Sequence, residues 1–146
     1  MPDRTRPLWA DLPHGDEITA LLDELRDLTD VEVRAMGATW RATWLATRLA
    51  TPVAVWGAAW RAVRVAADGA GRGMVREAVR DTALGAGRGD VDAGAATRDT
   101  ALALVVADLV GQYGLTRAHL DTLTGPARTV PRLAAIIDRA LPTKEN

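Results

Sequence analysis

A tetrapeptide repeat of alanine constrains this chain more than any other feature of its sequence. Alanine occupies every fourth position from Ala38 to Ala70, and a tryptophan or an arginine stands two residues after most of these alanines. Alanine has the highest helix propensity and arginine follows closely, so the repeat predicts helix. A four-residue period exceeds one helical turn by about 40°, and the alanines therefore wind around a straight helix. Each half of the repeat, divided at Pro52, would keep its alanines on one packing face, with the tryptophans filling space beside them.

Pro52 leaves two interpretations of the repeat open. One is a single long helix that is kinked at Pro52, which we favour because residues 47–55 contain no glycine for a helical turn. The other is a break into two antiparallel helices, with Pro52 in the first turn of the second helix. A hairpin centred on Ala50 would set Trp40 level with Trp60.

Helices separated by glycine and proline account for the rest of the chain, and no segment alternates with the period of a strand. We expect an all-α, single-domain bundle of about five to seven helices. Its apolar positions begin with Ile18, Leu21, Leu22, Leu25 and Leu28, which are spaced for one helical face. The expected organisation within residues 1–146 is an acidic amphipathic helix over 16–30, the Ala/Trp repeat over 33–68, a glycine-rich break over 69–96, and C-terminal helices over 97–141.

The glycine-rich break contains part of an internal duplication. Gly69-Ala-Gly-Arg-Gly73 recurs at residues 85–89, and Arg80-Asp-Thr-Ala-Leu84 recurs at residues 98–102. The glycine spacing matches neither a dinucleotide-binding fingerprint nor a phosphate-binding loop. We expect a short helix between the two glycine motifs and a mobile loop over residues 85–96, where few bulky side chains offset the entropy of ordering.

Charge is unevenly distributed along the chain. Residues 11–32 hold eight acids against Arg26, and residues 33–88 hold nine arginines against three acids, although the net charge is only −1. One interpretation is an acidic helix that packs against a basic one. The other is a basic patch that binds nucleic acid, which usually requires a stronger basic excess than this chain has.

The chain contains few side chains of the types that act as nucleophiles, general acids or bases, or metal ligands. Cysteine and serine are absent and only His14 and His119 carry imidazoles, so thiolate metal sites and serine nucleophiles are excluded. The acids are spaced along a helix surface and not as metal ligands. We therefore expect no catalytic residue, no cofactor, no metal and no enzyme activity. Residues 1–7 lack the apolar stretch of a signal peptide, and the uncharged run Leu49–Trp60 has only 12 residues, so we expect a cytoplasmic protein without a membrane span.

The C-terminal segment Asp99–Arg128 carries a family resemblance. It contains Leu104-Val-Val-Ala-Asp-Leu109 and Leu123-Thr-Gly-Pro126, and it resembles the closing segment of small actinobacterial and actinophage proteins in which an Ala-Trp repeat precedes this tail. The resemblance covers about residues 35–128 and departs from the pattern at Ala127, where the similar proteins have tryptophan. It implies an all-helical fold and an actinobacterial or phage origin, and it carries over no site residues.

We interpret the chain as a protein that acts through contacts with another protein or with a second copy of itself, as a phage or mobile-element accessory or structural protein would. The alternative is a helical module that binds nucleic acid through the Arg-rich region 34–88. The candidate interaction surface consists of the large and charged residues of the repeat: Trp40, Trp44, Trp56, Trp60, Arg41, Arg48 and Arg64.

Overall fold

The structure, a computed structural model, describes residues 7–49 and 53–141, without the side chains of residues 46–49 and 53–54. The described part of the chain holds seven α-helices, two short 3-10 helices and no strand, so the all-α class is confirmed. The elements are α1 (Gly15–Asp27), α2 (Asp30–Leu49), α3 (Val53–Gly69), α4 (Gly73–Gly85), α5 (Val91–Val105), η1 (Ala107–Leu109), α6 (Arg117–Thr124), η2 (Pro126–Thr129) and α7 (Pro131–Ala140). None of the described helices is long and apolar enough to cross a membrane.

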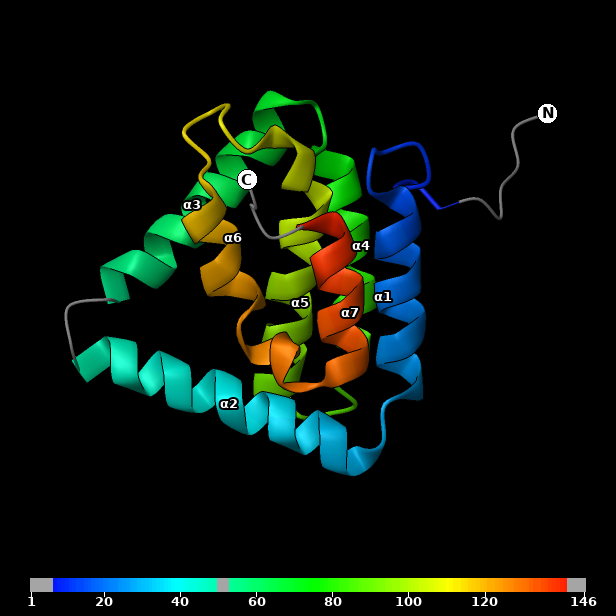
Figure 1. Cartoon of the computed structure of the whole chain (residues 1–146), viewed down its shortest axis with the longest axis vertical. Helices are drawn as coiled ribbons and strands as arrows, with labels where there is room; N and C mark the ends of the chain where they lie inside the picture. The colour runs from blue at the N-terminus through cyan, green and yellow to red at the C-terminus, as the bar shows by residue number, and fades with distance from the viewer. Residues whose placement is uncertain (1–6, 50–52, 142–146) are drawn as a thin grey trace.

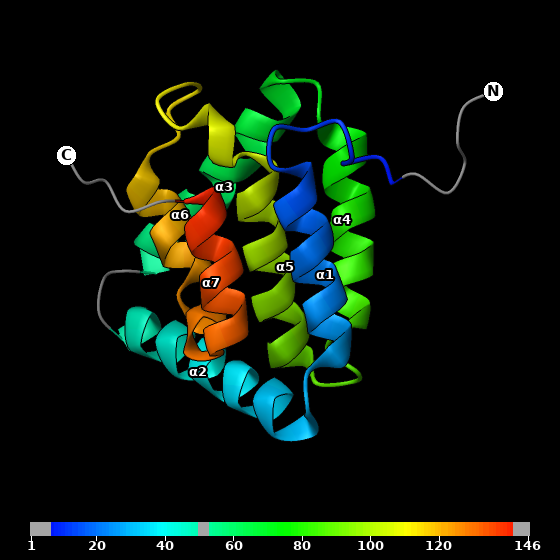
Figure 2. The same cartoon turned by 45° about the vertical axis from the view of Figure 1, so that its right-hand side comes forward.

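Helix α5 forms the centre of the bundle. It packs against α1, α2, α3, α4 and α6, which surround it in Figure 1 and Figure 2. Twelve of its 15 residues are buried. Residues 93–96 in the first half of α5 are alanine and glycine, so neighbouring backbones approach the helix closely there. A Cβ atom added to Gly37 of α2 would lie 3.0 Å from the backbone nitrogen of Ala93.

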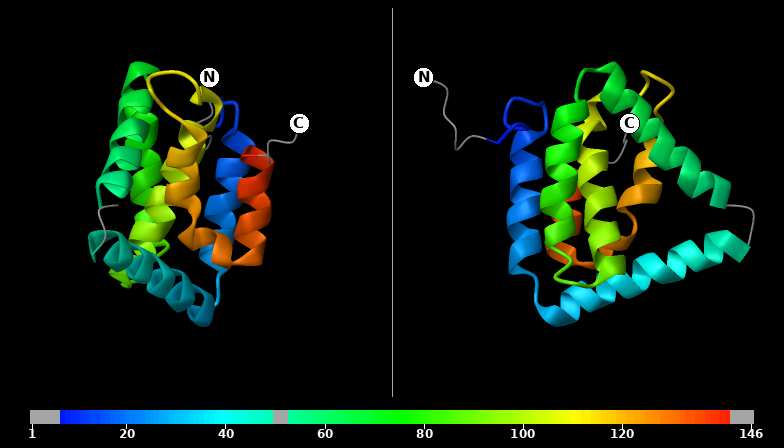
Figure 3. Two further views of the ribbon diagram at one scale, coloured as in Figure 1. Left: turned by 60° about the vertical axis from the view of Figure 1, so that its left-hand side comes forward. Right: turned by 180° about the vertical axis from the view of Figure 1, so that it is seen from behind.

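Helices α1 and α7 lie side by side on one side of α5, as the left view of Figure 3 shows. The predicted apolar face of α1 is confirmed, since Ile18, Leu21, Leu22, Leu25 and Leu28 are all buried. Helix α2 begins with a capping box, in which the Thr29 hydroxyl and the Glu32 carboxylate accept hydrogen bonds from each other's backbone N–H at 3.1 and 2.9 Å. Thr116 caps α6 in the same way with His119, whose ring nitrogen accepts from the Thr116 backbone.

The Ala/Trp repeat forms two helices, α2 and α3. The C-terminal end of α2 and the N-terminal end of α3 extend away from the other helices and approach each other, as the rear view in Figure 3 shows. The favoured single kinked helix is therefore not confirmed. Pro52 itself lies outside the described residues. Helix α2 packs mainly on α5 and α3 mainly on α6, so the principal contact of the repeat is with the bundle and not between its own two halves.

The alanines of the repeat do not form the packing ridge that their spacing suggests. Ala38, Ala42 and Ala58 are exposed, and Ala66 is the one described alanine of the register that is fully buried. Ala59 and Ala67, which stand outside the four-residue register, are buried to the same extent. The buried face follows the 3.6-residue period of the helix, and a four-residue row drifts away from that face within two turns.

The glycine-rich segment is more ordered than its sequence suggests. Residues 73–85 and 91–96 are helical, and Ala93–Ala96 are buried in the core, so the expected mobile loop over 85–96 is wrong for its second half. The two copies of the glycine motif instead make the α3–α4 and α4–α5 turns. Their positive-φ residues include Gly71 and Gly89, at φ +74° and +88°.

Each arginine of the duplicated glycine motif binds the end of another helix. Arg72 donates to the Val105 carbonyl at 2.8 Å, at the C-terminus of α5. Arg88 donates to the carbonyls of Leu25, Arg26 and Leu28, at the C-terminus of α1. These carbonyls lack partners within their own helices, and a cation at a helix C-terminus is favourable. The repeated motif is thus a turn that also fastens a second helix.

Candidate functional site

Four tryptophans gather where α2 and α3 meet the bundle. The rings of Trp40 and Trp44 stack with centroids 6.3 Å apart, and the ring of Trp40 meets that of Trp56 edge to face at 6.1 Å. Trp56 is buried, and Trp40, Trp44 and Trp60 are half-buried. Offset and edge-to-face contacts of this kind add to the stability that burial alone provides. The structure therefore brings together the four tryptophans that the sequence singles out.

A buried carboxylate lies at the centre of these tryptophans. Asp99 of α5 is 0% exposed. Trp40 of α2 donates its indole N–H to Asp99 Oδ2, and Trp60 of α3 donates to Oδ1, both at 3.1 Å. One carboxylate thus joins three helices. Because both oxygens accept hydrogen bonds from packed side chains, Asp99 positions α2 and α3 on the bundle.

Arg98 completes the surroundings of the carboxylate. Its Nε donates to Asp99 Oδ1 at 3.0 Å, and its guanidinium carbon lies 5.5 Å from the centre of the Trp60 ring. Burial raises the pKa of Asp99, and this effect outweighs the charge of Arg98 and the hydrogen bonds from Arg98 and the two indoles. We name Asp99, Arg98 and the four tryptophans the Trp–Asp cluster.

The outer faces of α2 and α3 form an exposed surface beyond the Trp–Asp cluster. We name this surface the arm. Its apolar members Leu45 and Val55 are 42% and 53% exposed. A shallow hollow in the arm is lined by Trp40, Arg41, Trp44, Leu45 and Asp92. The arm also carries the exposed arginines Arg41, Arg61 and Arg64.

The three arginines of the predicted interaction surface, Arg41, Arg48 and Arg64, differ in their surroundings. Arg41 lines the hollow, and Arg64 stands 6.0 Å from the centre of the Trp60 ring. Arg48 belongs to α2, but its side chain lies outside the described part of the structure.

Sequence reasoning missed Asp99 and Arg98. The available signal was an acidic residue among the alanines and leucines of residues 93–104, since a buried carboxylate needs donors and indoles supply them.

Most of the other arginines of region 34–88 are engaged within the fold. Arg72 forms an ion pair with Asp108, Arg76 with Asp68, and Arg80 with Glu77 and Asp81. Arg88 caps α1. The basic excess that is free for a partner is therefore concentrated on the arm.

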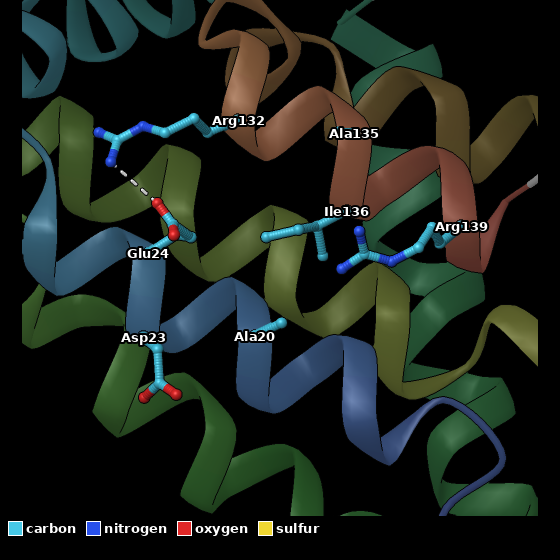
Figure 4. Close-up of a pocket in the computed structure, with 7 residues that line it drawn as sticks. All are labelled: Ala20, Asp23, Glu24, Arg132, Ala135, Ile136 and Arg139. Carbon is cyan, nitrogen blue, oxygen red and sulfur yellow. Dashed lines mark ion pairs between the residues drawn. The ribbon is translucent and has the colours of Figure 1, made fainter.

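A second surface hollow lies between α1 and α7. Figure 4 shows Arg132 of α7 reaching Glu24 of α1, an ion pair of 3.0 Å, while Asp23 points away from both Arg132 and Arg139. Arg132 also pairs with Glu32 at 2.8 Å. These contacts fasten α7 to α1 and α2. Ala20 and Ile136 form part of the apolar lining.

No group of three or more His, Asp or Glu side chains in the described part of the chain is arranged to hold a metal ion. His14 contacts Glu17 at 3.1 Å, and His119 belongs to the α6 cap.

Comparison with protein-family models, with curated proteins and with solved structures finds no match to this chain.

Proposed function

We propose that this chain is a non-enzymatic helical protein that acts through contacts with other proteins, and that the arm is its contact surface. The observation that carries the proposal is the composition of the arm. Leu45 is exposed beside Arg41 in the hollow of α2, and Val55 is exposed on α3, which also carries Arg61 and Arg64; these three arginines form no ion pair with any carboxylate in the described part of the chain. Exposed apolar side chains next to unpaired arginines are typical of surfaces that bind another protein.

The Trp–Asp cluster supports this proposal because it holds the arm in place. Trp40 and Trp60 connect α2 and α3 to Asp99 through hydrogen bonds of 3.1 Å. A surface that is ordered before binding loses less conformational entropy when its partner arrives. Trp44 lies at the edge of the hollow beside Leu45, and partly exposed tryptophans often dominate the energetics of an interface.

Photo-cross-linking in the cells that naturally produce the chain tests the proposal. A photoreactive phenylalanine analogue replaces Val55, which is exposed on the arm, or Met74, which is 77% exposed on α4 and serves as the control. We expect irradiation to give discrete protein adducts from position 55 and none from position 74. Absence of protein adducts from position 55, or equal adducts from both positions, would refute the arm as a contact surface.

Nucleic-acid binding is the second candidate, and the unpaired Arg41, Arg61 and Arg64 favour it. Each arginine that contacts a phosphate steepens the dependence of affinity on salt. An electrophoretic mobility shift with duplex and single-stranded DNA at low and moderate salt tests this candidate. A shift that disappears steeply with salt and weakens in Arg41→Gln/Arg61→Gln would support it, and no shift at low salt would exclude it.

The cytoplasmic location and the role as a phage or mobile-element accessory or structural protein remain part of the same proposal. The phage or mobile-element role rests on the resemblance of segment Asp99–Arg128. The genes adjacent to this one provide the test. Capsid, lysis or repressor genes would support a phage role, and a purely metabolic neighbourhood would count against it.

A further inference from the structure

We propose that the arm binds the acidic outer face of α1 on a second copy of this chain, so that copies associate head to tail. This inference rests on the proposed function of the arm as a contact surface. It adds the identity of one partner and the face that the partner presents.

The arm carries positive charge that the fold does not neutralise. Residues 33–67 contain five arginines and no acid. Arg41, Arg61 and Arg64 are exposed and form no ion pair with a carboxylate among the described residues. Apolar surface from Leu45 and Val55 lies on the same two helices. The arm thus fits a partner that presents carboxylates together with small or apolar side chains.

The outer face of α1 presents this combination. Asp16, Asp23 and Asp27 are exposed and follow one helical stripe, with Ala20 between the first two. Asp16 and Asp27 form no ion pair within the described part of the chain, and Asp23 pairs only with the exposed Arg26 at 3.3 Å. Surface pairs of the latter kind contribute little and are easily exchanged for others.

The two charged faces cannot neutralise each other within one molecule. Helix α1 packs on α7, α5 and α4, and not along α2 or α3. Figure 1 and the rear view in Figure 3 both show α1 on the side of the bundle opposite the converging ends of α2 and α3. The acidic helix α1 does contact the basic region 33–88, through α4 and Arg88, but it does not pack along the arm, and a second copy would supply that contact.

The properties of the whole molecule favour this partner. The net charge of −1 imposes little repulsion between copies. Two arms facing each other would repel, because both carry unpaired arginines. Contact between two different faces is heterologous, so successive copies form a ring or an open filament and not a closed twofold dimer.

Sedimentation velocity of the full chain over a range of concentrations tests the proposal. At about 0.01 M salt, where charges interact over about 30 Å, we expect species larger than a monomer, and at about 0.15 M salt we expect a clear shift toward monomer. Arg41→Gln/Arg61→Gln removes two charges of the arm and should weaken association by about tenfold or more. Arg80→Gln/Arg128→Gln changes the net charge equally, leaves both the arm and the outer face of α1 intact and serves as the control.

A mixing experiment distinguishes head-to-tail contact from other association. The arm variant retains α1, and the variant Asp16→Asn/Asp27→Asn retains the arm. Each should sediment as a monomer alone, and the mixture should form a 1:1 complex that grows no further. A monomeric parent chain at low salt, an arm variant that associates like the parent, or a mixture that stays monomeric would each overturn the proposal.

The cross-linking at position 55 separates this outcome from failure of the proposed function. Adducts with twice the mass of the chain support the second copy as partner. Adducts with a different protein alone overturn the second copy and leave the contact function of the arm intact. Nuclease-sensitive adducts, without any protein adduct, overturn both and favour the nucleic-acid candidate.

Discussion

Arg72 and Asp108 form a bidentate ion pair, with Nη1 2.7 Å from Oδ1 and Nη2 2.9 Å from Oδ2. The pair connects the α3–α4 turn to η1. Arg72 Nη1 also donates to the carbonyl of Val105, so one side chain neutralises a carboxylate and caps α5. We expect Arg72→Lys to lower the free energy of unfolding by about 1–3 kcal/mol, because an ammonium group cannot make the paired contacts. Urea unfolding measures this difference, and a variant as stable as the parent chain would contradict it.

The pH dependence of stability follows from two carboxyl groups. Burial alone would raise the pKa of Asp108, but the hydrogen bonds and charge of Arg72 lower it below its usual value. The backbone N–H of Thr29 lowers the pKa of Glu32, an effect that desolvation opposes and Arg132 reinforces. A carboxyl with a lowered pKa binds fewer protons in the folded state. Its stabilising effect is complete above the ordinary pKa and is lost as pH falls through the lowered value.

We therefore expect the free energy of unfolding to decrease as pH falls below about 5, and Asp108→Asn to flatten this decrease. Urea titrations at a series of pH values measure the effect. Asp81→Asn, on the exposed face of α4, is the control and should leave the slope unchanged. Asp99 changes the free energy of unfolding with pH in the opposite direction, because burial raises its pKa. Its contribution to stability is present at low pH and decreases as pH rises through the ordinary value toward the raised one.

The two indole contacts of Asp99 should differ in their contribution to stability. Among the described residues, Oδ2 accepts a hydrogen bond only from Trp40, whereas Oδ1 accepts from both Trp60 and Arg98. Trp40→Phe leaves a buried oxygen without a donor and should cost about 1–3 kcal/mol more than Trp60→Phe. Thermal and urea unfolding of both variants test this order. In an Asp99→Asn background the difference should shrink, and an unchanged difference would show that ring packing causes it.

Two glycines of the second turn motif provide a matched pair. A Cβ on Gly87 would lie 2.6 and 2.7 Å from the backbone of Gly94, whereas a Cβ on Gly85 would have no neighbour within 4 Å. We expect Gly87→Ala to separate α4 from α5 and to lower the melting temperature. Gly85→Ala should leave the melting temperature unchanged or raise it. Because Gly85 is helical, the alanine should add up to about 1 kcal/mol to the free energy of unfolding. Equal melting temperatures for the two variants would refute the close approach.

Adjacent alanines of α3 test the corrected packing face of the repeat. Ala59 is 0% exposed and Ala58 is exposed. Ala59→Leu should cost about 1–3 kcal/mol through overpacking, and Ala58→Leu should change stability by no more than about 0.5 kcal/mol. Circular dichroism melts of the two variants measure the contrast. The reverse order would mean that the four-residue register, and not the helical period, marks the buried face.

Much of the fold follows from local patterns. The leucines and Ile18 of α1 recur at helical spacing, and Thr116 marks the beginning of α6 as an N-cap residue does. Residues 91–96 could not be recognised in this way. The alanines and the glycine of this segment are consistent with a loop. The reason for small residues in a helix here is that Gly37 approaches the backbone of Ala93 and Gly87 approaches the backbone of Gly94.

The Trp–Asp cluster was only half predictable. Tryptophans at regular spacing signal a packed face, but the position of Asp99 depends on partners 59 and 39 residues away. The local sequence cannot locate it, because Arg-Asp-Thr-Ala-Leu occurs twice. In α4 its aspartate, Asp81, is exposed and pairs with Arg80, whereas in α5 the equivalent Asp99 is fully buried.

These two environments of one pentapeptide have an evolutionary consequence. If the copies arose by duplication, the same aspartate now occupies a surface and a core environment, and the core environment is tolerable only while Trp40 and Trp60 supply donors to it. Loss of Trp40 leaves Oδ2 of Asp99 without its donor, loss of Trp60 leaves Oδ1 with Arg98 alone, and loss of Asp99 leaves both indole N–H groups without their acceptor. Homologous chains should therefore retain Asp99, Trp40 and Trp60 as a set or replace all three together, whereas Asp81 should vary freely.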